Sequence, residues 1–205
     1  MSRILELYQK ILDLYQQDKN TTGRFVDEVF ELEYYAPGVA NLTIVDLGAY
    51  EGEFGYYCYN FAKVIYAVEP DPRPFEIMKQ RVGEFGLDKF KLFNIAISGK
   101  SGIRPFHNTG YGGSSLGVGG DTMDIETLSL ADFIDKEKIE KVDILKIDVE
   151  SSEIEIFSAD DFPSVSDRIQ TIVGEVHGGE EIIKDKLTTL GFEYKSFPNC
   201  FVAKR

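Results

Sequence analysis

Two short stretches in the second half of the chain place charged residues at alternate positions where apolar runs end. The first carries Lys146, Asp148 and Glu150, and the second carries Glu175 and His177. Alternate side chains of a strand point to the same face, and charged groups at the end of a buried strand are costly unless they are paired or used. If the two strands are neighbours, we expect these five groups to converge on one cleft.

This set of groups is suited to moving a proton while a hydroxyl group acts as a nucleophile. His177 or Asp148 could take the hydroxyl proton as a general base, and Lys146 could stabilise the alkoxide that develops. We therefore predict Asp148, His177 and Lys146 as catalytic residues. The residues predicted to contact the acceptor are Glu150, Glu175 and His107, the last from a glycine-rich loop. His107 could equally be an ordinary surface histidine.

The same charged residues allow two other interpretations. Asp148, Glu150 and His177 could bind a divalent metal ion that orients a diol, because carboxylate oxygens suit Mg²⁺. We do not favour this metal interpretation. Alternatively, Lys146 and Glu175 could form a cross-strand ion pair while His177 only caps a loop.

The segment IVDLGAYEG, residues 44–52, begins like a buried strand and then breaks into small and acidic residues. Gly48 and Gly52 would let the backbone approach a ligand without a Cβ in the way. Asp46 could hold an ammonium group or fix the N–H groups of the loop. The alternative is that the two glycines only make a tight turn from a strand to a helix.

A second apolar run ends in Glu69, which lies 21 positions beyond Gly48, about where an acid accepts both hydroxyls of a ribose. Asn94 and Ala96 follow at the third run, where a flat base could lie against apolar backbone. A glycine loop, a ribose acid and a third apolar wall together predict a nucleoside pocket. The residues that we predict to bind the cofactor are Asp46, Gly48, Gly52, Glu69, Asn94 and Ala96.

The spacing within this loop disfavours a dinucleotide. A dinucleotide-binding loop has three glycines spaced as G-x-G-x-x-G, whereas this chain has D-x-G-x-x-x-G with Tyr50 inside it. The nearby acids Asp46, Glu51 and Glu53 would repel a pyrophosphate. A cationic ligand that carries a ribose fits better, and S-adenosylmethionine has a sulfonium, an ammonium group and an adenosine.

The elements that must position these residues alternate along the chain. Short apolar runs rich in β-branched residues predict strands at 42–47, 64–69, 91–97, 142–148 and 169–176. Segments with helical character lie between most of them, near 54–62, 73–84, 129–139, 152–158 and 180–190. This alternation predicts a mainly parallel sheet covered by helices on both faces.

The connection 98–128 departs from this alternation because it holds a glycine-rich stretch. We interpret 108–121 as a mobile loop that becomes ordered over a bound acceptor. Short strands are predicted on either side of it, near 102–106 and 123–128.

The two ends of the chain also differ from the centre. Helical spacing of apolar residues predicts an N-terminal helical extension over 1–40, followed by one domain over 41–205. The chain ends in two predicted strands, 192–194 and 200–203, joined by a Pro-Asn turn that makes them antiparallel.

Composition limits the classes of partner and compartment. Of 205 residues, 43% are hydrophobic, which is enough for one packed domain. No apolar run is long enough for a membrane span, and a formal net charge of −13 disfavours a nucleic-acid partner. The first residues carry no secretion signal, and Cys58 and Cys200 lie among apolar residues, so we expect buried thiols in a reducing, cytoplasmic compartment. A homodimer stays open.

These motifs, in their order, resemble the FkbM-type S-adenosylmethionine-dependent methyltransferases. The stretches that carry the resemblance are IVDLGAYEG, YAVEPDP, NIAIS, the paired serines of the glycine-rich loop, ETLSLADFI, VDILKIDVE and TIVGEVHG, which cover roughly residues 42–192. The resemblance implies a three-layer, Rossmann-like methyltransferase fold with a seven-stranded, mostly parallel sheet. It also implies methylation of a hydroxyl, often on a sugar or natural product. The chain departs from the family at Ser151 and Ser152, which follow Glu150 where the family has Gly and Ala.

We therefore expect an S-adenosylmethionine-dependent enzyme that methylates a hydroxyl of a small-molecule or glycan acceptor. The leading alternative is a non-catalytic nucleoside-binding or partner-binding module on the same fold, and Ser151 and Ser152 are the residues that favour it. A nicotinamide-dependent oxidoreductase is disfavoured by the glycine spacing and by the terminal hairpin.

Overall fold

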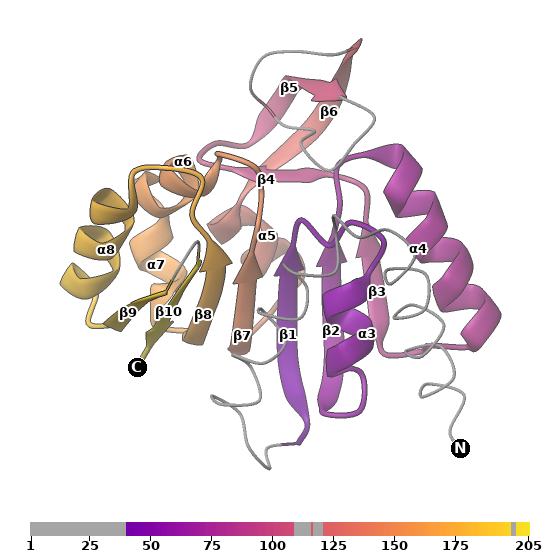
Figure 1. The fold of residues 1–205 in the computed structure, drawn as a ribbon, viewed down its shortest axis with the longest axis horizontal. Helices are drawn as coiled ribbons and strands as arrows, with labels where there is room; N and C mark the ends of the chain where they lie inside the picture. The colour runs from indigo at the N-terminus through magenta and orange to yellow at the C-terminus, as the bar shows by residue number, and fades with distance from the viewer. Residues whose placement is uncertain (1–39, 109–115, 117–120, 198–199) are drawn as a thin grey trace.

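The computed structural model of the chain describes residues 40–108, 116, 121–197 and 200–205 (Figure 1). The helical extension predicted for residues 1–40 lies almost entirely outside this part of the chain. The same is true of most of the 108–121 loop, so its predicted mobility stays a prediction.

Seven strands form one mostly parallel sheet in the order β3-β2-β1-β7-β8-β10-β9. Their bounds are β1 (Leu42–Leu47), β2 (Ala62–Val68), β3 (Phe90–Phe93), β7 (Val142–Ile147), β8 (Ile169–Glu175), β9 (Glu193–Phe197) and β10 (Cys200–Lys204). β10 is antiparallel to both β8 and β9. The predicted seven-stranded sheet with an antiparallel terminal hairpin is thereby confirmed.

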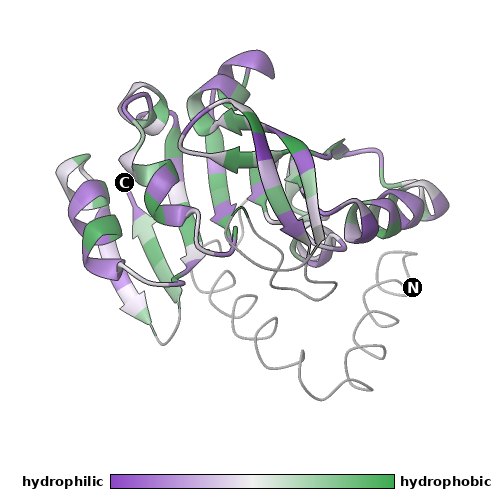
Figure 2. Cartoon of the chain, turned by 90° about the horizontal axis from the view of Figure 1, so that it is seen from above, coloured by the Kyte–Doolittle hydropathy of each residue, from purple (hydrophilic) through white to green (hydrophobic). Residues whose placement is uncertain are grey.

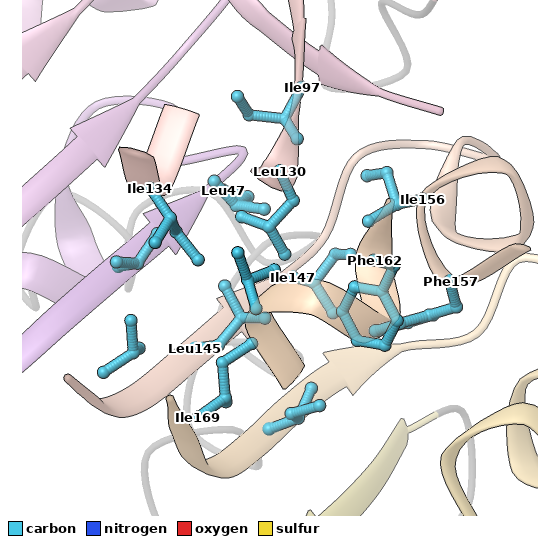
Figure 3. Close-up of a cluster of buried hydrophobic side chains, with 14 of the residues drawn as sticks. Leu47, Ile97, Leu130, Ile134, Leu145, Ile147, Ile156, Phe157, Phe162 and Ile169 are labelled. Atoms are coloured by element: carbon cyan, nitrogen blue, oxygen red, sulfur yellow. The ribbon is translucent and has the colours of Figure 1, made fainter. Parts of the chain in front are cut away.

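Helices cover both faces of this sheet, as the alternation of elements predicts (Figure 1). On one face lie α3 (Glu53–Cys58) and α4 (Pro72–Phe85), and on the other lie α5 (Leu130–Lys136), α6 (Glu153–Ser158), α7 (Phe162–Ser166) and α8 (Glu180–Thr189). Figure 2 shows hydrophobic residues dominating the central strands, while the helices mix hydrophobic and hydrophilic residues. Figure 3 shows part of the core between the sheet and the helices α5 to α8, where Leu145 and Ile147 of β7 lie near Phe157 and Phe162.

Local sequence explains where α4 begins and ends. The Asp71 carboxylate accepts a hydrogen bond from the backbone N–H of Arg73 at 3.0 Å, and Pro72 occupies the first turn, where a missing N–H costs nothing. Gly86 ends the helix with a φ of 63°, a conformation that glycine adopts without strain. This helix is therefore fixed directly after the turn that follows β2.

A second sheet of three strands lies above the carboxyl ends of the parallel strands (Figure 1). It contains β4 (Ala96–Ser98), β6 (Asp121–Ser129) and β5 (Gly102–Asn108) in that order, so short strands near 102–106 and 123–128 are confirmed. The single strand predicted over 91–97 is wrong, because the chain leaves the large sheet after β3 and joins the small one as β4. The Asn94 side chain occupies the break and donates hydrogen bonds to the carbonyls of Glu69 and Pro70 at 2.8 and 3.0 Å.

Two other expectations are decided by the described residues. Cys58 is buried, but Cys200 is partly exposed, so only the first is the buried thiol that its apolar neighbours predict. Among the helices of the described ranges, none combines the length and the apolar character needed to cross a bilayer.

The junction between β1 and β7 explains the first glycine of the loop. Gly48 has a φ of 75°, and a Cβ built on it would lie 1.7 Å from the backbone carbonyl oxygen of Asp148. The two strands are parallel neighbours, and the Asp148 N–H donates to the Leu47 carbonyl at 3.0 Å. A side chain at position 48 would therefore push the ends of the two strands apart.

We expect Gly48→Ala to lower the free energy of unfolding by more than about 2 kcal/mol, since it adds both strained backbone and overlap with a neighbouring strand. The matched control is Gly83→Ala, because Gly83 lies in α4 with no atom within 4 Å of an added Cβ. This control should keep or raise stability by up to about 1 kcal/mol. Urea unfolding of both variants measures the difference, and equal effects would contradict the contact described for Gly48.

Candidate active site

His177 lies at the centre of a cluster of carboxylates just beyond β7 and β8. Its Nε2 atom is 3.4 Å from Glu175, 3.5 Å from Glu150 and 3.9 Å from Asp148. Its Nδ1 atom is 3.0 Å from Oε1 of Glu153, within hydrogen-bonding distance. The alternation of charged residues thus leads to the expected geometric convergence, while the chemical roles of the residues stay predictions.

The carboxylates hold the His177 ring in its charged form. The hydrogen bond to Glu153, and then the neighbouring Glu175, raise the pKa of His177 to about 10, although burial opposes the shift. Because an imidazolium cannot accept a proton, this environment weighs against His177 as the general base in the ligand-free protein. Of the two predicted bases, Asp148 is then better suited to accept a proton.

Glu153 is the functional candidate that the sequence reasoning missed. It is buried at the start of α6, and its Oε1 atom also accepts the N–H of Val149 at 3.1 Å. It thereby joins the histidine to the turn after β7, in which Glu150 and Ser151 have φ values of 50° and 81°. The available signal was an acidic residue in the first turn of a predicted helix, where negative charge is stabilised.

Lys146 ties the glycine loop to the charged cluster. Its Nζ donates to the carbonyl of Gly48 at 2.8 Å and lies 3.6 Å from Asp148 and 3.7 Å from Asp46. These contacts favour a structural role for Lys146, because its ammonium group joins the ends of β1 and β7.

The Asp46 side chain makes different contacts from those expected. It is fully buried, and within the described part of the chain neither of its carboxylate oxygens makes a hydrogen bond. Burial raises the pKa of Asp46 to about 6, and Lys146 opposes the shift. The expectation that Asp46 fixes the N–H groups of the loop is wrong, because the N–H groups of Gly48 and Ala49 donate to the Val68 carbonyl instead.

Glu69 organises the glycine loop from the end of β2. It is buried and accepts the N–H of Tyr50 at 2.8 Å through Oε2 and the N–H of Asp71 at 2.7 Å through Oε1. Burial raises the pKa of Glu69 to about 8, although these two donors oppose the shift. Each carboxylate oxygen has two lone pairs, so both can accept a further hydrogen bond from a ligand hydroxyl.

The remaining candidates for the cofactor and the acceptor have protein neighbours of their own. A Cβ at Gly52 would meet the side chains of Tyr56 and Met78, so this glycine, like Gly48, makes room for protein atoms. Ala96 is buried in the small sheet's core instead of forming an open apolar wall. His107 in β5 lies opposite Thr122 in β6, with one ring nitrogen 3.4 Å from the threonine hydroxyl.

A narrow pocket adjoins the charged cluster. It is lined by Phe54, Lys146, Val173, Gly174, Glu175, Cys200 and Phe201. The cavity is small, about 20 Å³.

The structure also changes the set of residues suited to a metal ion. Asp148, Glu175 and His177 each offer one ligand atom, and these three atoms lie within 4.8 Å of one another. The sequence alone predicts Glu150 in place of Glu175.

Comparison with known proteins identifies what this arrangement resembles. The profile of the methyltransferase FkbM domain matches residues 46–194, which include both the glycine loop and the charged cluster. No curated protein sequence matches the chain.

Solved structures show the same fold at low sequence identity. The FkbM methyltransferase of Methylobacillus flagellatus aligns with a TM-score of 0.58 and 11% identity, over 80% of this chain and 44% of its own. The precorrin-6y C5,15-methyltransferase of Geobacter metallireducens aligns with a TM-score of 0.54 and 13% identity, over 88% and 87%. A protein of the NADB-Rossmann superfamily from Streptococcus agalactiae also gives 0.54 and 13%, over 87% and 67%. This chain therefore spans less than half the length of the Methylobacillus protein.

The ion pair at the base of the cluster gives a stability prediction. We expect Lys146→Ala to lower the free energy of unfolding by about 3–5 kcal/mol, because it leaves the buried Asp46 without its cation. Lys141→Ala is the control, since Lys141 is itself exposed and pairs with Asp143, so its loss should change stability by less than about 1 kcal/mol.

A paired replacement separates this electrostatic effect from packing. The double variant Asp46→Asn with Lys146→Met removes both charges and should recover much of the stability lost in Lys146→Ala. Thermal and urea unfolding provide the measurement. If Lys146→Ala were as mild as Lys141→Ala, Lys146 would not be the counter-ion of Asp46.

Proposed function

Because the chain belongs to the FkbM methyltransferase family, we propose that it transfers the methyl group of S-adenosylmethionine to a hydroxyl of a sugar or small natural product. One observation carries the proposal. Lys146 joins the carbonyl of Gly48, in the predicted cofactor loop, to Asp148 in the charged cluster at the same edge of the sheet. In open α/β sheets this edge, at the carboxyl ends of the strands, is where ligands bind.

The residues around the glycine loop fit the proposed cofactor. Glu69 lies at the end of β2, and its two oxygens keep lone pairs for the hydroxyls of a ribose. Glu51 and Glu53 both pair with Arg81, at 2.7 and 3.9 Å, so the preference for this cofactor over a pyrophosphate rests on the spacing of the glycines. When bound, S-adenosylmethionine supplies a methyl group activated by a positively charged sulfur.

Asp148 is the residue best placed to take the acceptor's proton. Held by Glu69 and the glycine loop, S-adenosylmethionine would supply the methyl group, and the acceptor hydroxyl would lose its proton as its oxygen is methylated. The hydroxyl proton passes to Asp148. His177 keeps its own proton and holds the carboxylates of Glu150 and Glu175 beside the acceptor.

The serines that favour a non-catalytic module leave the shape of the turn intact. Ser151 has a φ of 81°, a conformation that glycine adopts without strain, and the family has glycine at this position. Ser152 still precedes α6, whose first residue Glu153 contacts His177. The geometry beyond β7 therefore supports a catalytic protein more than a binding module.

The first test concerns the cofactor. We expect Glu69→Ala to weaken S-adenosylmethionine binding by about 1–3 kcal/mol, which corresponds to lost hydrogen bonds to the ribose hydroxyls. The control is Glu76→Ala, because Glu76 is an exposed residue of α4 that pairs with Lys79. Titration calorimetry measures both, and unchanged affinity in Glu69→Ala would remove Glu69 from the cofactor site.

The second test concerns the chemistry. On a confirmed acceptor, Asp148→Asn should slow methyl transfer at least about a hundredfold, the contribution of a general base, while cofactor affinity stays nearly intact. His177→Ala should also slow transfer, because Glu150 and Glu175 lose the cation between them. Asp135→Asn is the control, since Asp135 is an exposed partner of Arg168 on α5. Transfer of a radiolabelled methyl group gives the rate. Near-normal turnover in both site variants would make the cluster a structural network only.

A further inference from the structure

We propose that Asp148, Glu175 and His177 bind a divalent first-row transition-metal ion, of the Mn²⁺ or Zn²⁺ class, at the ends of β7 and β8. The inference rests on the proposed function in one respect, because the ion would lie where the acceptor hydroxyl is expected and could orient a diol there.

The spacing of the three side chains matches one coordination sphere. Nε2 of His177 lies 3.4 Å from Oε2 of Glu175 and 3.9 Å from Oδ1 of Asp148, and one ligand atom from each of the three residues lies within 4.8 Å of the others. Ligand atoms bonded to one ion at about 2.0–2.2 Å lie about 3 Å apart when adjacent and about 4.2 Å apart when opposite. Shifts of up to about one ångström would therefore bring all three to one ion.

Two of these ligand atoms are buried without a hydrogen bond. Within the ranges that the structure describes, Oδ1 of Asp148 and Nε2 of His177 are inaccessible to solvent and have no hydrogen-bond partner. Buried polar atoms are nearly always satisfied. Because both atoms face each other across the cluster, a single bound cation would satisfy both.

Glu153 supplies the support that a metal-binding histidine needs. Its Oε1 accepts from Nδ1 of His177 at 3.0 Å and from the N–H of Val149 at 3.1 Å. Its side chain is 2% exposed, so this orientation of the ring is fixed by packing. A carboxylate on one ring nitrogen presents the other nitrogen to a metal and increases its basicity.

The charges of the cluster favour a bound cation, and the types of ligand atom indicate which metal ions would bind. Glu150, Glu175 and Asp148 all lie within 4 Å of Nε2 of His177. Several carboxylates around one partly buried point need positive charge. Protonated His177 supplies it in the ligand-free protein, and a bound ion would displace the Nε2 proton and supply the charge instead. One imidazole with two carboxylates suits Mn²⁺ or Zn²⁺ better than Mg²⁺, which prefers oxygen ligands alone.

The experiment uses the full chain, freed of metal with a chelator and then dialysed. Loss of the free Mn²⁺ signal in electron paramagnetic resonance, and calorimetry with Zn²⁺, should show one site per chain. His177→Ala and Asp148→Asn should each weaken binding at least about a hundredfold, and Glu153→Gln should weaken it about 10–100-fold. His107→Ala, which removes the chain's other histidine, and Asp135→Asn should bind as the unmodified protein does.

The outcomes separate this site from the proposed function. No stoichiometric binding of either ion to the unmodified protein overturns the metal site, as does unchanged binding in a folded His177→Ala or Glu175→Gln variant. Circular dichroism identifies the folded variants. S-adenosylmethionine is titrated separately into the metal-free protein. Cofactor binding without metal binding refutes only the metal site, whereas metal binding without cofactor binding refutes only the proposed function.

Discussion

The close contact between the ends of β1 and β7 is the constraint on which the rest of this edge depends. Gly48 approaches the Asp148 backbone so closely that no side chain fits, and Lys146 reaches across the same junction to the Gly48 carbonyl. The loop after β1 and the charged groups after β7 therefore share one anchor. A displacement at either strand end would disturb both the loop after β1 and the charged cluster, because Lys146 contacts both.

Charge is distributed unevenly across this anchor. On one side of it, the fully buried Asp46 has Lys146 as its ion-pair partner. On the other side, several carboxylates surround one imidazolium. Buried ion pairs of this kind add little net stability but are costly to break. Here these ion pairs fix the positions of the acidic groups, which would otherwise repel one another.

Sequence reasoning predicted most of the architecture and part of the site, for reasons that particular residues make clear. Apolar runs predicted the strands, and alternation predicted that Lys146, Asp148, Glu175 and His177 would meet, because a period of two acts within each strand and parallel neighbours end at one edge. Glu153 escaped prediction because its contact with His177 requires left-handed backbone at Glu150 and Ser151, which neither residue type favours. The prediction of one strand over 91–97 was wrong because Asn94 ends β3 by donating hydrogen bonds to the turn after β2. The pattern of apolar residues does not reveal such side-chain bonds.

The small sheet is built so that its segment of the chain can be replaced without disturbing the large sheet. Its strands hydrogen-bond to one another and are separate from the large sheet, and Ala96, where the chain enters, pairs with Thr127, near where it leaves. The chain therefore enters and leaves the small sheet at neighbouring positions, and the segment between them is an insertion at one point of the larger α/β fold. Evolution or engineering can lengthen, shorten or replace such an insertion while the seven-stranded scaffold keeps its register. Diversity in what related proteins recognise could then accumulate here at little cost to folding.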